Sequence, residues 1–340
     1  METNSGILVY IELDRENEIA PVSLELVYKA TELSQKLDGE KVIAYVIGTN
    51  IDYEPIINRL QNTGADEVVI TNDDKYKNYS TLLFANAVEK VIEYKKPSIA
   101  LFGASTRGRD LAPRISSRLK TGLTADCTGL DINEKEKLAA TRPTFGGSLM
   151  ATILCKTLPQ MATVRPNVFQ LPKELPHKQA NVEYFDVDTQ NIPQDVELLE
   201  FTPNPKTTTK NITESQIIVA GGKGMKSAEG FRLLSELAEA LGAALGASRG
   251  AVDSGWVDHS IQVGQTGKTV APKIYIACGI SGAIQHTVGM NSSDKIIAIN
   301  SDPNAPIFNI SDYGIIGDVF EIVPQLIEEI KNGDFPQIKN

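Results

Sequence analysis

Residues 246–286 read GASRGAVDSGWVDHSIQVGQTGKTVAPKIYIACGISGAIQH, and this stretch decides how the rest of the chain is interpreted. Loops rich in Gly, Ser, Thr and Gln alternate here with short apolar runs, of which IYIACG at 274–279 is the clearest. Glycine lets the backbone approach a ligand closely, and exposed backbone N–H groups bind phosphates. We therefore predict a nucleotide cradle whose polar side chains are Ser248, Gln262, Gln265, Thr266, Ser281 and Gln285.

The first half of the chain alternates strand-like and helix-like segments. Apolar runs predict strands at 6–13, 41–48, 67–70 and 98–103, and helical spacing predicts helices at 23–37, 55–63 and 82–94. Strands and helices that alternate with short connections form right-handed βαβ units around a parallel sheet. From Thr121 onward the β-like pieces become shorter, which predicts an antiparallel end to this domain over 123–132, 138–147, 149–155 and 161–166.

An arginine-rich loop, GASTRGRDLAPR, follows the strand at 98–103. We expect Asp110 to cap the next helix, with Pro113 in its first turn. Loops at the carboxyl ends of parallel strands are where such sheets bind ligands. Two interpretations therefore stay open, a phosphate site or ion pairs with acidic neighbours or another subunit, for Arg107, Arg109 and Arg114.

Prolines concentrated over 170–212 mark a boundary between two domains. We predict an N-terminal domain over 1–190, a linker over 191–212 and a second domain over 213–340. The second domain is expected to hold a strand within 216–225, a helix over 227–242 from Ser227 to Gly242, a helix beginning near Ser281, a strand within 294–308 and a helix over 318–330. Both domains are predicted to be α/β, each with a mostly parallel sheet flanked by helices in a Rossmann-like or flavodoxin-like arrangement.

Charge and cysteine content exclude several functional classes. A net charge of −10 argues against nucleic acid or an anionic membrane as the main partner, because phosphates need a basic face. The three cysteines are far apart and form no CxxC pair, so we expect no disulfide framework, zinc site or iron–sulfur cluster. The sequence contains no run of eighteen apolar residues, so we expect no membrane-spanning helix. We therefore expect a cytoplasmic protein.

No constellation of catalytic side chains is visible. A Ser/His/Asp triad would need His177, His259 or His286, and no G-x-S-x-G motif precedes them. The loop at 222–227 is an incomplete dinucleotide fingerprint, and GQTGKT at 264–269 lacks the spacing of a P-loop. A chain that binds a cofactor without its own acid, base or nucleophile leaves the chemistry to that cofactor, and redox chemistry is the natural candidate.

Several long motifs occur in an order that resembles one family. The runs GASRGAVDSGW, QVGQTGKTVAPKIYIACGISGAIQH, IAINSDPNAPIF and DYGIIGDVFEIVP are similar to the α subunit of electron transfer flavoprotein, also called FixB. The resemblance covers about 216–330 closely and the first 190 residues more loosely. It implies that the second domain binds FAD and that the first docks on a smaller β subunit.

Carried over by motif, the resemblance also implies a set of FAD contacts. The expected contacts are Lys223, Ser248, Arg249, Gln262, Val263, Gly264, Gln265, Thr266, Ser281, Gly282, Ala283, Ile284, Gln285, His286, Asn300 and Asp318. The first glycine loop of the family usually reads GGRG and here reads GGKG, so Lys223 keeps the positive charge but loses the planar fork of arginine.

Three of these residues are expected to tune the flavin. We hypothesise that Arg249 stabilises the negative charge of the reduced ring, that Thr266 hydrogen-bonds N5, and that His286 donates to O2. Asn300 and Asp318 are expected to fix the adenosine portion. The resemblance assigns no metal to the site.

The resemblance implies an electron carrier, and several partners follow from it. These are the β subunit, acyl-CoA dehydrogenases, a membrane quinone oxidoreductase, and ferredoxin or flavodoxin. An alternative is an electron-bifurcating form that oxidises NADH through the β subunit. Two alternatives from other classes are an NAD(P)-binding enzyme with its own substrate and a non-redox nucleotide-binding subunit.

Overall fold

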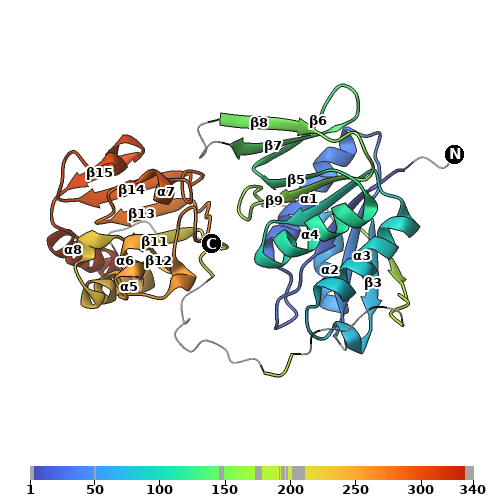
Figure 1. Ribbon diagram of the computed structural model, residues 1–340, viewed down its shortest axis with the longest axis horizontal. Helices are drawn as coiled ribbons and strands as arrows, with labels where there is room; N and C mark the ends of the chain where they lie inside the picture. Colours follow the sequence, from blue (N-terminus) through green and yellow to red (C-terminus); the bar gives the residue numbers. More distant parts are fainter. Residues whose placement is uncertain are drawn as a thin grey trace. The chain divides into compact units, whose positions relative to one another are not determined.

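The structure is a computed structural model that describes residues 4–49, 51–144, 149–172, 178–190, 192, 196, 198–200 and 211–333. The chain divides into two compact units, Met1–Thr202 and Pro203–Asn340. Figure 1 shows that each unit is built around its own β-sheet with helices packed against it. The α/β class with parallel sheets flanked by helices is therefore confirmed.

The first unit is built on a seven-stranded sheet in which every neighbouring pair is parallel. In spatial order its strands are β10 (Asn181–Tyr184), β3 (Glu67–Asn72), β2 (Val42–Gly48), β1 (Ile7–Ile11), β4 (Ile99–Gly103), β9 (Gln160–Val164) and β5 (Leu123–Cys127). Its helices are α1 (Pro21–Gln35), α2 (Glu54–Thr63), α3 (Thr81–Lys95) and α4 (Thr106–Leu119), with a short 3₁₀ turn, η1, at Asp74–Tyr76.

Both faces of this sheet are buried, which explains why its strands read as continuous apolar runs. Alternate residues of β1 point to the hydrophobic clusters on the two faces of the sheet. Ile7 and Val9 pack with α1 and α2, whereas Leu8 and Tyr10 pack with α3 and α4. The helices therefore cover opposite faces of the sheet in pairs.

The predicted antiparallel end is only partly correct. β6 (Gly129–Ile132), β7 (Leu138–Thr144) and β8 (Leu149–Leu154) do form a separate antiparallel sheet. However, β5 and β9 pair in parallel inside the main sheet. The predicted short strands follow one another with few residues between them, so the sequence shows no crossover helix among them. The helix that makes the parallel connection to β5 is α4, which precedes these strands.

Two further expectations for the first unit are wrong. Helix α4 begins at Thr106 rather than near Asp110, because the Ser105 hydroxyl accepts a hydrogen bond from the Gly108 N–H at 3.0 Å. Pro113 consequently lies inside the helix. Residues 181–185, which lie inside the predicted first domain, extend its core: β10 pairs with β3, and Phe185 packs on the cluster beneath α3.

The second unit holds a five-stranded sheet that is also parallel throughout. In spatial order its strands are β12 (Ala244–Ala247), β11 (Ile217–Gly221), β13 (Ile274–Cys278), β14 (Lys295–Asn300) and β15 (Tyr313–Ile316). Its helices are α5 (Ala228–Leu241), α6 (Arg249–Asp253), α7 (Ile284–Thr287) and α8 (Val319–Asn332), and its 3₁₀ turns are η3 (Lys223–Met225), η4 (His259–Ile261) and η5 (Pro306–Asn309).

The two faces of this second sheet are covered differently. Helices α5 and α8 pack together on one face, as Figure 1 shows. On the other face the core is closed by loop residues, among them Val263, Ile280 and Ile307. The cradle loops therefore belong to the hydrophobic core and are held in place by it.

The ends of α5 were predicted correctly. The Ser227 hydroxyl accepts from the Gly230 N–H, and Gly242 adopts φ 61° at the carboxyl end. The helix expected near Ser281 is only four residues long and starts at Ile284. The strand expected within 294–308 ends at Asn300, since Asp302 and Asn304 build a turn instead.

No helix in the described ranges is long and apolar enough to cross a membrane.

Candidate cofactor site

The predicted contacts gather at one edge of the five-stranded sheet, where its parallel strands end. Lys223 follows β11, Ser248 follows β12, Ser281 follows β13, Asn300 ends β14, and Asp318 follows β15. The chain passes from β11 to β12 on one side and then to β13 on the other, so the strand order reverses at β11. Ligands of doubly wound sheets bind in the crevice at this reversal.

The loops after β11 and β13 touch through their backbones. A Cβ atom on Gly222 would lie 2.2 Å from the Gly279 carbonyl oxygen, and one on Gly224 would lie 2.6 Å from the Gly279 Cα. Gly279 itself has φ +60°. Only glycine fits at these positions, so the sequence signal GGKG reflects loop-on-loop packing as well as ligand approach.

The loops 262–266 and 281–286 are joined in the same way. The Gln265 N–H donates to the Gln285 carbonyl at 2.7 Å, and a Cβ on Gly264 would lie 2.6 Å from that same oxygen. Beyond them, the Ile307 N–H donates to the Ser281 carbonyl at 3.0 Å. The structure thus brings together two segments that the sequence separates by an entire strand.

Three consecutive N–H groups are available at the rim of this cradle. Within the described part of the chain, the amides of Ser281, Gly282 and Ala283 donate to no other group. Gly282 has φ +90°, which orients successive amides toward a common side. A phosphate would satisfy these donors.

The cationic side chains expected at the site are exposed. Arg249 is 68% exposed, and its Nε lies 3.3 Å from the Asp253 carboxylate, which is 62% exposed. An ion pair in such a setting contributes little to stability. Lys223 lays its aliphatic stem against Gly250, where a Cβ would be 3.2 Å from Lys223 Cγ. Both positive charges are therefore available to an anionic ligand.

His286 differs because its ring is buried. Its Nε2 is hydrogen-bonded to the Tyr275 hydroxyl at 3.0 Å, and the residue is 6% exposed. Burial lowers the pKa of His286 to about 4, and the nearby Val263 backbone acts in the opposite direction. Its Nδ1 is buried and makes no regular hydrogen bond with any residue that the structure describes. The imidazole is therefore neutral at physiological pH.

Sequence reasoning missed Tyr275 as the partner of this histidine. Tyr275 lies in the middle of β13 and is fully buried, so it reads as an ordinary core residue. His286 lies on α7 and meets Tyr275 only in the folded chain.

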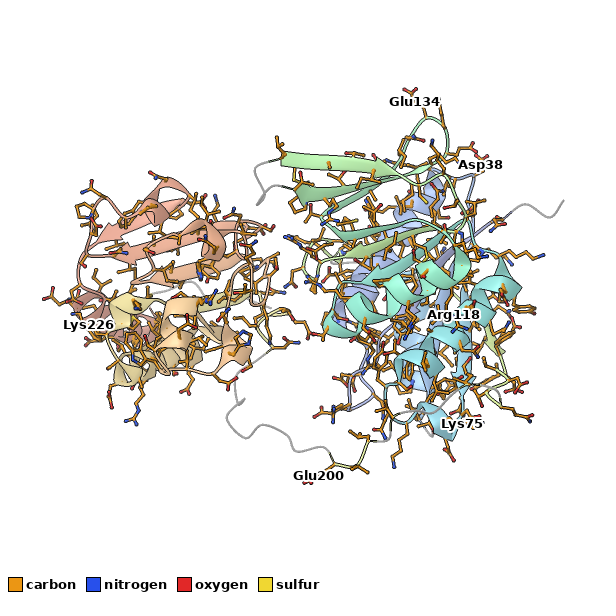
Figure 2. All side chains as sticks on the ribbon, viewed as in Figure 1. Asp38, Lys75, Arg118, Glu134, Glu200 and Lys226 are labelled. Carbon is orange, nitrogen blue, oxygen red and sulfur yellow. The ribbon has the colours of Figure 1, made fainter. Side chains whose placement is uncertain are left out.

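Asn300 and Asp318 brace the loops on which they lie. The Asn300 amide donates to the Ile280 carbonyl at 2.9 Å and its oxygen accepts from the Asp302 N–H at 3.0 Å. Asp318 caps α8 by accepting from the Phe320 N–H at 2.9 Å, which lowers the pKa of its carboxyl group. Its partner Lys226 lies 3.4 Å away. Figure 2 shows Lys226 at the surface of the second unit.

The other predicted contacts divide into exposed and buried groups. Gln265, Thr266, Gln285 and the apolar Ile284 are exposed at the rim. Buried positions are Val263, Gly264 and Gln262, and the Gln262 side chain donates to the Thr266 hydroxyl at 3.2 Å. Ser248 lies at the start of α6 and its N–H donates to the Gly221 carbonyl at 2.9 Å.

The arginine-rich loop of the first unit is engaged within its own unit. Arg109 forms an ion pair with Asp126 at 2.7 Å, and Arg107 donates to the Leu13 carbonyl at 2.9 Å while covering the Tyr79 ring. Arg114 is exposed. His177 lies outside the described residues.

A cavity of about 550 Å³ in the first unit lies at the opposite, amino-terminal edge of its strands. Among the residues that line it, Lys95 pairs with Glu67 at 2.6 Å. The same lysine also pairs with Glu183 at 2.5 Å. The buried charge of Lys95 is thus paired with two carboxylates, and we assign this cavity no ligand.

The cradle fits a flavin dinucleotide. Free amides and the exposed Lys223 suit a pyrophosphate, while the exposed Arg249, uncharged polar groups and the 74% exposed Ile284 suit the face and edge of a ring. Across the described residues, no group of three or more His, Cys, Asp or Glu side chains could hold a metal ion. The site offers cofactor binding and tuning, with the chemistry supplied by the cofactor.

Comparisons with known proteins agree with this assignment. Residues 7–190 match the electron transfer flavoprotein domain, and residues 211–291 match the electron transfer flavoprotein FAD-binding domain. The second match includes the glycine loops described above, and the cofactor is FAD.

Curated relatives match over nearly the whole chain. The electron transfer flavoprotein subunit alpha of Thermoanaerobacterium thermosaccharolyticum is 46% identical over 97% of this chain and 99% of its own length. The FixB protein of Clostridium saccharobutylicum is 47% identical over 96% of both chains. The LctC subunit of the lactate dehydrogenase (NAD⁺, ferredoxin) of Acetobacterium woodii is 41% identical over 96% of this chain and 77% of its own length. The chain belongs to the electron transfer flavoprotein α-subunit family, whose members are FAD-binding electron carriers.

Proposed function

We propose that this chain is the α subunit of a heterodimeric electron carrier of the cytoplasm, with FAD held across the loops at the carboxyl edge of the five-stranded sheet. The observation that carries the site assignment is the convergence of five strand ends on glycine loops that offer unbonded amides and exposed cations to an anion. The bound isoalloxazine ring accepts and releases electrons, and the residues of the chain bind it, orient it and tune its potential.

Three residues carry the tuning in this proposal. Arg249 places an exposed positive charge near the ring, and Thr266 presents a hydroxyl to N5. His286 contributes a neutral imidazole at the pyrimidine side, so the positive charge near the ring comes from Arg249. Lys223 and the amides of residues 281–283 hold the pyrophosphate, and Asn300 and Asp318 hold the adenosine portion.

We further propose that the first unit docks on the β subunit through strand β8. This strand is at the edge of its sheet and carries large apolar side chains that face solvent: Leu149 and Met150 are each 58% exposed, Ile153 40% and Leu154 49%. Monomeric proteins rarely leave such an edge uncovered. Leu149→Lys combined with Ile153→Lys should abolish co-purification of the β subunit, whereas Tyr184→Lys on the distant edge strand β10 should not.

A specific observation favours a second candidate, an electron-bifurcating form. The relative from Acetobacterium woodii is named for a dehydrogenase that uses both NAD⁺ and ferredoxin. In this form NADH would react on the β subunit and its electrons would divide between ferredoxin and an acyl-CoA dehydrogenase. In the simpler carrier, an acyl-CoA dehydrogenase would reduce the FAD of this chain.

Flavin content and NADH reactivity distinguish the two forms. The chain is co-purified with its β subunit, its FAD per heterodimer is measured, and it is titrated anaerobically with NADH. Two FAD reduced by NADH would indicate bifurcation. One FAD that is inert to NADH but reduced by an acyl-CoA dehydrogenase with its substrate would indicate the simple carrier. A heterodimer without flavin would contradict both.

A further inference from the structure

Gln262 is a polar residue enclosed within the cradle. It is 2% exposed and follows the 3₁₀ turn η4, and its backbone pairs with Ala247 at the end of β12. Its N–H donates to the His259 carbonyl at 2.9 Å, and its carbonyl accepts from the Lys268 N–H at 2.7 Å. Both backbone groups are thus used to hold the loop, which leaves the side chain to be explained.

The side chain packs closely against the turn at Gly267 and has one polar partner. A Cβ on Gly267 would lie 3.0 Å from Gln262 Cγ and 2.4 Å from its carbonyl oxygen, so the turn closes tightly over this residue. From this position the Gln262 Nε2 donates to the Thr266 hydroxyl at 3.2 Å. A buried amide with a fixed stem can impose its polarity on the group that it contacts.

The direction of this hydrogen bond decides what Thr266 offers to a ligand. An amide NH₂ group only donates, so the Thr266 oxygen must accept. The single hydroxyl hydrogen of Thr266 then remains available, and Thr266 is exposed at the rim of the cradle. In this arrangement Thr266 can donate its hydroxyl hydrogen to a ligand bound over the loop.

We propose that Gln262 is a positioning residue that acts on the flavin through Thr266, by holding the Thr266 hydroxyl as a hydrogen-bond donor. Its burial means that it does not touch the cofactor itself, which differs from the direct contact expected from the sequence. This inference rests on the proposed function, in which Thr266 faces N5 of the flavin. A donor at that nitrogen stabilises the added electron density of the reduced ring, so its loss lowers the potential.

A double-mutant cycle tests the inference in the FAD-loaded heterodimer. Thr266→Val removes the hydroxyl, and Gln262→Met removes the donor while keeping the length of the side chain. Gln262→Glu replaces the donor with a carboxylate that only accepts and therefore draws the Thr266 hydrogen to itself. The measured quantity is the flavin midpoint potential from anaerobic spectroelectrochemical titration, with the visible flavin spectrum as a second readout.

We expect Thr266→Val and Gln262→Met to shift the potential downward, and the Gln262→Met shift to vanish when Thr266 is already Val. Gln262→Glu should lower the potential further, and only the part due to its charge should persist beside Thr266→Val. Where a variant loses FAD during purification, the same cycle is read from the fold-change in FAD dissociation constant on reconstitution.

The outcomes separate this inference from the proposed function. No shift in Thr266→Val would contradict the placement of Thr266 at the flavin. A shift in Thr266→Val with none in Gln262→Met would overturn the role of Gln262 alone. An equal Gln262→Met shift in both backgrounds would mean that Gln262 acts by another route, and an upward shift would mean that its amide has the opposite orientation.

Discussion

Single residues of the cradle fall into those that present charge and those that hold geometry. Arg249 and Lys223 are exposed, whereas His286 and Gln262 are buried and hydrogen-bonded to Tyr275 and Thr266. In the proposed function, Arg249 and Thr266 act on the flavin from exposed positions, His286 adds a buried neutral ring, and Gln262 holds Thr266 in place. Substitutions at the two kinds of residue should have different effects.

Arg249→Ala should lower the flavin potential by tens of millivolts, because it removes a positive charge that stabilises the reduced ring. For one electron, about 60 mV corresponds to about 1.4 kcal/mol. FAD binding should weaken but persist, since the loop amides remain. The measurement is an anaerobic redox titration of the heterodimer. Asp253→Asn is the matched control, because it removes the ion pair and leaves the guanidinium. If Asp253→Asn reproduced the full effect, Arg249 would be acting through the ion pair.

The buried His286 should make the apoprotein sensitive to acid. Its pKa is about 4 in the folded chain and ordinarily about 6.5, so the unfolded state binds more protons between these values. Stability should fall as the pH drops from 6.5 to 4, by up to about 3 kcal/mol from this residue. Below pH 4 both states are protonated and no further loss follows.

His286→Phe provides the comparison, because it removes the titration and keeps a ring in the same volume. Urea unfolding at several pH values should show a steeper loss in the unsubstituted chain than in His286→Phe between pH 6.5 and 4. Carboxylates common to both proteins cancel in the difference. Parallel curves would show that the ring is solvated in the folded chain.

At the scale of elements, the site is made by loops whose backbones pack on one another. Helix α7 cannot begin earlier than Ile284, because Gly282 has φ +90°, which is not a helical conformation. The loop before it lies against η5 instead. Element lengths at this edge therefore follow from the cradle and not from helix propensity.

Gly282→Ala should destabilise the second unit and abolish FAD binding. A Cβ there would lie 2.2 Å from the Ile307 nitrogen in addition to the strain of its positive φ. Gly255→Ala is the control: Gly255 has φ +72° with nothing within 4 Å, so it should cost only about 1–2 kcal/mol. Urea unfolding and flavin fluorescence titration would show this difference. Equal costs for both variants would mean that the η5 loop moves aside.

At the scale of the whole molecule, the chain consists of two units with separate cores. The two clusters under α1 to α4 belong to the first unit, and the cluster under α5 and α8 and the one closed by the cradle loops belong to the second. The boundary at Thr202 and Pro203 leaves each sheet intact. Each unit can therefore respond to a ligand independently.

We expect two calorimetric unfolding transitions in the isolated chain, of which only one depends on FAD. A ligand that binds only the folded state, and is present at a concentration about a hundredfold above its dissociation constant, stabilises that state by about 2.7 kcal/mol. Removal of FAD should therefore lower the transition of the second unit and leave the other unchanged. A single transition that shifts as a whole would show that the units unfold together.

Strong local patterns were sufficient for much of the fold. The continuous apolar runs of β1 to β4 and the capped helix α5 were predicted within about two residues. Weak patterns were not sufficient: β12 and β15 are four residues long, and neither was expected as a strand. Such short segments become strands only because a neighbour in the sheet pairs with them.

The sequence by itself determined the fold class, the family and the position of the glycine loops where we propose the site, because glycine spacing and apolar periodicity are local and survive without knowledge of contacts. The tertiary structure alone decided which side chains in those loops face outward. It buried His286 against Tyr275, enclosed Gln262 beneath Gly267 and left Arg249 exposed. Exposure and hydrogen-bond direction depend on residues distant in the chain, which no local pattern contains.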